Sequence, residues 1–109
     1  MSVEVLVKLK ELKFVASEAE KQLDNSGMSI TNLQKEQLFN HNVKNIVNAI
    51  EGLLRNEPSE RHHFRLEKEI PDSYVNIKKL KDTPQGRNNV HLDRIKDLVS
   101  YFEGVYREI

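Results

Sequence analysis

Apolar residues recur along the chain at the spacing of amphipathic helices. In the first segment the intervals alternate between four and three residues, at Val5, Leu9, Leu12, Ala16, Ala19 and Leu23. Positions with this spacing share one stripe of a helix. Residues 3–9 also alternate as a strand would, but the helical spacing continues to Leu23 and therefore predicts a helix. Gly27 or Asn25 is expected to end this helix in the left-handed conformation.

A second helix is predicted over residues 30–56, with its apolar stripe at Phe39, Val43, Ile46, Ile50 and Leu53. Ser29 or Thr31 is the expected N-cap. Thr31 and Gln34 have the spacing of a capping box. With Ser29 as the cap, Met28 and Leu33 would instead form a hydrophobic staple.

The following segment has sparse apolar residues and two interpretations. Pro58 is expected to end the second helix or to begin the next one. Pro71 then divides the segment, because proline disrupts a helix interior. Two short helices over residues 60–69 and 73–81, the second capped by Asp72, are favoured. A hairpin around Pro71 and Asp72 is the alternative.

The last helix is expected to start at Asn88 or Asn89 as its N-cap. Its apolar stripe has the same spacing, at Leu92, Ile95, Val99, Phe102, Tyr106 and Ile109. Stripes of this kind suit antiparallel packing in bundles. We therefore expect one all-α domain over residues 1–109, a small three- or four-helix bundle.

Charge balance and apolar content indicate which kinds of partner the protein can bind. The 109 residues hold 17 Lys and Arg and 17 Asp and Glu, so binding of nucleic acid is not favoured. The basic residues Lys78, Lys79, Lys81 and Arg87 form the best candidate for an anion-binding surface. Only 38% of the residues are apolar, which favours self-association as a homodimer or a partner that completes the fold.

Several classes of site are absent from the sequence. There is no cysteine, so disulfides and thiolate metal sites are excluded. His62 and His63 are adjacent and have no third ligand at a useful spacing, and we expect neither a metal nor a cofactor. No apolar stretch reaches the roughly 20 residues that cross a bilayer. We expect a cytoplasmic protein, and the frequent Asn, Lys, Ile and Glu suit a bacterial or phage genome.

One run on the second helix resembles the phosphoacceptor helix of sensor histidine kinases. That family places a histidine, an Asn or Thr four residues later, and an apolar run that ends in Ile, a small residue, Leu and Leu. The matching positions are His41, Asn45, Ile50, Gly52, Leu53 and Leu54. The resemblance implies phosphorylation of the His41 imidazole, with Asn45 one turn away beside the phosphate. Without an ATP-binding domain, it implies a kinase-less phosphorelay or a dimeric mimic of that bundle.

A second run, from Arg55 and the polar Asn56 to His62, resembles the motif of HEPN ribonucleases. That family is small, all-α and dimeric, and pairs Arg with His across the dimer. The resemblance implies that Arg55 would stabilise a phosphate and that His62 would transfer the proton.

The long amphipathic helices favour a different function, that of a small interaction or regulatory protein. Such helices serve both core packing and partner docking. An inhibitor, an immunity or anti-defence factor, or a subunit of a larger complex would fit this description. Tyr101 lies off the stripe of the last helix and is the candidate anchor of a protein interface.

Overall fold

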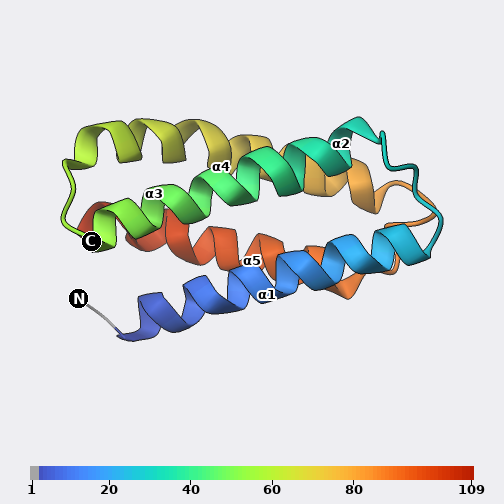
Figure 1. The fold of residues 1–109 in the computed structure, drawn as a ribbon, viewed down its shortest axis with the longest axis horizontal. Coiled ribbons are helices and arrows are strands. Elements are labelled where there is room, and N and C mark those ends of the chain that lie inside the picture. The colour runs from blue at the N-terminus through green and yellow to red at the C-terminus, as the bar shows by residue number, and fades with distance from the viewer. Residues whose placement is uncertain (1–2) are drawn as a thin grey trace.

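The first helix of the computed structural model, α1, spans Val3–Asn25 (Figure 1). The structure describes residues 3–109, so the first two residues of the predicted domain lie outside it. All six residues of the predicted stripe are buried. The helix ends in a Schellman motif, in which the N–H of Gly27 donates to Asp24 O and that of Met28 donates to Leu23 O, both at 3.1 Å. Gly27 has φ 87°, so its predicted role as the terminator of α1 is confirmed.

The second helical rod contains three parts that follow one another without a break, and Figure 1 shows them as one continuous coil. They are α2 (Leu33–Glu36), the π-helical segment η1 (Gln37–Val43) and α3 (Lys44–Leu54). The prediction of Ser29 or Thr31 as N-cap was wrong. Asn32 is the cap, because its Oδ1 accepts the N–H of Lys35 at 2.9 Å. The Ser29 and Thr31 hydroxyls instead lie 2.9 Å from each other.

The two features predicted around that cap were also wrong. Gln34 cannot close a capping box with Thr31, because the helix begins only after Asn32. Met28 is buried, but Leu33 is exposed, so the two do not form a staple that closes the helix start.

The third helix, α4, spans Ser59–Lys81 without interruption, so both the division at Pro71 and the hairpin were wrong. Asp72 is consequently a residue of the helix interior and not a cap. The Pro71 side faces solvent, and the opposite side buries Leu66, Ile70, Ile77 and Leu80. An interior proline costs about 3 kcal/mol, and burying four such residues offsets that cost. Local propensity at Pro71 is therefore overridden by packing.

The fourth helix, α5, spans Val90–Val105 and continues into one 3₁₀ turn, η2 (Tyr106–Glu108). Asn89 is its cap, as predicted, because the side-chain oxygen accepts the N–H of His91 at 3.1 Å. The Asn89 amide also donates to Ala19 O at 3.0 Å, which ties the start of α5 to α1. One residue thus satisfies groups on two helices.

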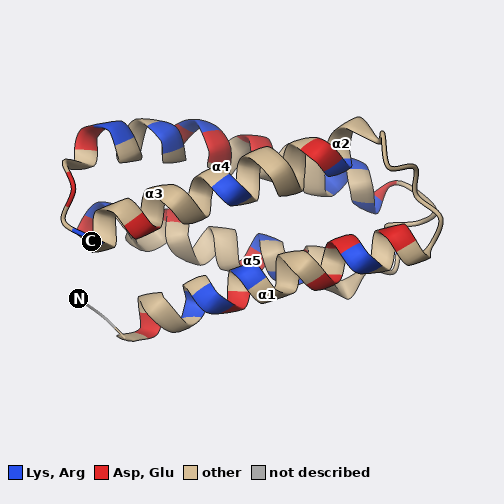
Figure 2. Cartoon of the chain, in the orientation of Figure 1, with Lys and Arg blue, Asp and Glu red and all other residues tan. Residues whose placement is uncertain are grey.

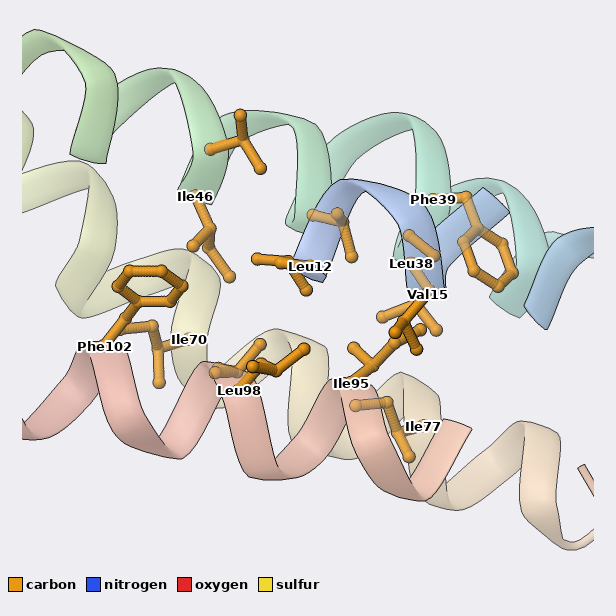
Figure 3. Close-up of a cluster of buried hydrophobic side chains, with 14 of the residues drawn as sticks. Leu12, Val15, Leu38, Phe39, Ile46, Ile70, Ile77, Ile95, Leu98 and Phe102 are labelled. Carbon is orange, nitrogen blue, oxygen red and sulfur yellow. The ribbon is translucent and has the colours of Figure 1, made fainter. Parts of the chain in front are cut away.

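The four rods run alternately up and down the bundle, and the start of α1 lies at the same end as the C-terminus (Figure 1). α1 packs mainly on α5, and α3 packs mainly on α4. Side chains from all four rods meet in the core, as Figure 3 shows for Leu12, Ile46, Ile70 and Phe102. The predicted all-α bundle is therefore confirmed, with four helical rods in the described residues.

Candidate functional site

The helix α1 is apolar on two opposite faces. Successive residues are about 100° apart around a helix, and four large apolar side chains of α1 therefore point away from the core stripe. They are Val3 (75% exposed), Leu6 (44%), Val7 (56%) and Phe14 (64%). We call these four residues, with the exposed Lys10 among them, the outer face of α1. The buried core uses the other face, and among the described residues the outer face remains largely exposed.

The outer face was not predicted from the sequence, although its signal was present. Val3, Val7, Lys10 and Phe14 follow intervals of four, three and four, as the core stripe does. The lysine interrupts this second stripe, and the valines at its start also suit a strand. The other elements each carry fewer large exposed apolar residues than α1 does. Scattered exposed apolar residues are normal on a protein surface. Here they are Ile30, Leu33, Phe64, Val75 and Val90.

Two ion pairs attach α1 to the bundle on either side of the outer face. Glu11 accepts two hydrogen bonds from Arg94 of α5, at 2.6 and 2.8 Å. These bonds hold the pKa of the Glu11 carboxyl below its usual value. On the other side, Lys13 Nζ lies 2.9 Å from Glu51 Oε2 of α3. Figure 2 shows acidic and basic positions interspersed along α1.

Tyr101, the predicted interface anchor, lines a groove at the end of the bundle where α1 begins and α5 ends. The groove has a volume of about 450 Å³ and is lined by Val5, Leu53, Tyr101 and Val105, among others. Lys8 Nζ lies 5.6 Å from the centre of the Tyr101 ring. Burial, followed by the charge of Glu4, raises the pKa of Tyr101. Tyr101 is thus half-buried beside the start of α1, and not an isolated surface aromatic.

The two residues predicted for phosphotransfer have different neighbours in the structure. The His41 side chain is 52% exposed, and its Nε2 lies 4.0 Å from Glu36 Oε1. Asn45 points towards α4, where its amide donates to Glu69 Oε2 at 2.8 Å. The Asn42 amide donates to the other oxygen of the same carboxylate, also at 2.8 Å. Asn45 therefore helps to hold α4 through Glu69.

This buried polar cluster was missed from the sequence. Asn42 and Glu69 are 2% and 8% exposed, and Asn76 adds a third amide by donating to Asn42 Oδ1 at 2.8 Å. Glu69 stands next to the buried Ile70, so its position beside the core stripe was the available signal. Every donor around the carboxylate is a neutral amide. Such a cluster fixes the register of two helices.

Arg55 and His62 both contact the carboxylate of Glu57. Glu57 Oε2 accepts the Arg55 Nε–H at 3.0 Å, and Glu57 Oε1 lies 3.0 Å from His62 Nε2. These two bonds, that from Arg55 foremost, hold the pKa of Glu57 below its usual value. The His62 side chain is only 7% exposed and its ring lies against Gly52. The group thus closes the turn between α3 and α4.

The predicted basic surface is interrupted by carboxylates. Lys78 Nζ lies 3.4 Å from Asp82 Oδ2, and Lys81 Nζ lies 2.9 Å from Asp93 Oδ2. Lys79 and Arg87 are both exposed. Two of these four cations, Lys78 and Lys81, are therefore paired with carboxylates.

The described residues contain no group of three or more His, Asp or Glu side chains that could hold a metal ion. Within residues 3–109, no helix has the length and apolar character needed to span a membrane. Comparisons with models of protein families, with curated proteins and with solved structures found no match for this chain.

Proposed function

We propose that this protein is a small interaction module that binds a helical segment of a protein partner on the outer face of α1. The observation that carries the proposal is the pair of opposite apolar faces on α1, of which the core uses one. A helix that is apolar on both sides is stable in water when each side is covered. Apolar side chains at intervals of three and four residues are the anchors by which helices recognise one another.

Two side chains that were candidates for catalysis already have structural hydrogen-bond partners, and this favours binding over catalysis. Asn45 holds Glu69, and His62 is buried on Glu57, so both side chains already have structural partners. The outer face, by contrast, lies on a helix that two ion pairs and a buried stripe hold rigidly. A rigid surface loses little conformational entropy on binding. We propose that the partner is cytoplasmic, because the sequence features described above favour a cytoplasmic protein.

The experiment places a photoreactive residue at position 7 or at position 75 and cross-links the protein in living cells. Both native residues are exposed valines, on α1 and α4 respectively. The proposal predicts a discrete cross-linked product from position 7 and none from position 75. Phe14→Lys should abolish that product, and Val90→Lys should leave it unchanged. Equal labelling from both positions, or a product that survives Phe14→Lys, would contradict the proposal.

A further inference from the structure

The solvent-facing side of α4 carries a row of cations that the fold leaves unpaired. Arg61, Arg65 and Lys68 are exposed, and their intervals of four and three residues place them on one side of the helix. Within residues 3–109, none of the three forms an ion pair with a carboxylate. Figure 2 shows several basic positions in the first half of α4. We call these three residues, with Phe64 among them, the basic row of α4.

The basic row costs stability and takes no part in the core, because α4 buries its opposite side. Like charges three or four residues apart on a helix repel one another, and Arg65 has such a neighbour on either side, in Arg61 and Lys68. The carboxylates nearby do not offset this repulsion. In the described part of the chain Asp72, one turn beyond Lys68, forms no ion pair with it, and Glu67 pairs with η2 instead. A partner that brings negative charge would relieve the repulsion.

An exposed aromatic ring and a hollow beside it indicate what kind of anion fits. Phe64 is 73% exposed and stands one turn from both Arg61 and Lys68. An open hollow of about 500 Å³ is lined by Pro58, Glu60, Arg61 and Phe64. Unpaired nucleobases stack on aromatic rings and guanidinium planes, and a carboxylate accepts hydrogen bonds from their amino groups. Glu60 would instead repel an acidic peptide. The hollow therefore favours a single-stranded nucleic acid over an acidic peptide.

We infer that the first half of α4 binds a single-stranded nucleic acid, with one base stacked on Phe64 and the neighbouring phosphates on the cations of the basic row. From Arg61 to Lys68 the helix rises about 10 Å, which corresponds to about three nucleotides at roughly 3.4 Å each. The chain carries no net charge, so the attraction is local. Contacts with about three phosphates make the binding weak and dependent on salt. This surface lies on a different helix from the outer face of α1, so the inference does not rest on the proposed function.

Fluorescence anisotropy with a labelled oligothymidylate of about 12 nucleotides tests the inference, because small single-strand binding domains cover sites of this order. Three phosphate contacts give a salt slope of about −2, so the affinity should fall roughly 20-fold between about 50 and 200 mM salt. Arg65→Gln should weaken binding and reduce the magnitude of that slope by about 0.7. Phe64→Ala should weaken binding by about fivefold or more, because it removes the ring on which the base stacks.

Two substitutions on other helices are the matched controls. Lys96→Gln removes an exposed cation of α5, and Leu33→Ala shortens an exposed apolar side chain of α2. Both should bind like the wild type, and circular dichroism on heating should show that all four variants remain folded. The absence of saturable binding up to about 1 mM protein, or unchanged binding by Phe64→Ala, would overturn the inference. It would also be overturned if polyglutamate, or a duplex of equal length, displaced the label as well as unlabelled oligothymidylate does.

Discussion

The close approach of α3 to the start of α4 makes Gly52→Ala a sharp test of the packing described above. A Cβ at position 52 would lie 2.4 Å from Nε2 and 2.5 Å from Cε1 of His62. It would also lie 2.9 Å from Glu57 Oε1. The His62 ring is almost fully buried, so it cannot turn aside without breaking its contact with Glu57. The substitution therefore forces apart the group that closes this turn.

The expected magnitude follows from three contributions. Overpacking costs about 1–3 kcal/mol, and loss of the bond between His62 and Glu57 costs about 1 kcal/mol. Replacing glycine by alanine inside a helix returns about 1 kcal/mol. The net destabilisation is therefore about 2 kcal/mol, which lowers the midpoint of thermal unfolding by roughly 10 °C for a domain of this size. Circular dichroism during heating and urea denaturation measure both quantities.

Gly104→Ala is the matched control. Gly104 is an exposed residue of α5, and a Cβ there would meet no atom within 4 Å. This variant should gain about 0.5–1 kcal/mol. Combining Gly52→Ala with His62→Ala should recover part of the loss, because the clash disappears. If Gly52→Ala were as stable as the wild type or behaved like Gly104→Ala, the contact between His62 and Gly52 would be refuted.

Three further outcomes are expected. Asn89→Ala should destabilise the fold by about 2 kcal/mol, measured by urea denaturation, because it removes the cap of α5 and a buried donor to Ala19 O. Glu69→Ala should cost about 2 kcal/mol in the same assay, because it leaves two amides without their acceptor. Burial, followed by the bond to Glu103, raises the pKa of Tyr74 to about 12. An ordinary tyrosine ionises near pH 10, so the unfolded state ionises first and stability falls between about pH 10 and 12. Tyrosinate absorbance should show late ionisation, and Tyr74→Phe should lower its amplitude by the share of one tyrosine, because burial also raises the pKa values of Tyr101 and Tyr106.

The helices were predictable from the sequence wherever a periodic stripe decided their burial. The stripes of α1 and α5 and the caps Gly27 and Asn89 follow from spacing and local backbone chemistry, and the structure confirms them. At Pro71 the same local reasoning failed. A stripe of buried residues on the far side of α4 outweighs the hydrogen bond that the proline removes.

The candidate site was less accessible to sequence reasoning than the fold. Exposure of Val7 and Phe14 depends on which side of α1 meets the bundle, and both sides carry apolar residues at helical spacing. The partners of Asn45 and His62 come from α4 and from the turn before it, and no local pattern indicates those contacts. Spacing identifies which side chains share a face, whereas tertiary packing decides which face remains open.

The central claim is that the outer face of α1 is an interface, and photo-cross-linking from that face in living cells tests it most directly. A photoreactive residue in place of Val7 is compared with one in place of Val75, an exposed valine of α4. The account predicts a discrete product from position 7 that is lost in Phe14→Lys, and no product from position 75. No product from position 7, or equal products from the two positions, would contradict it.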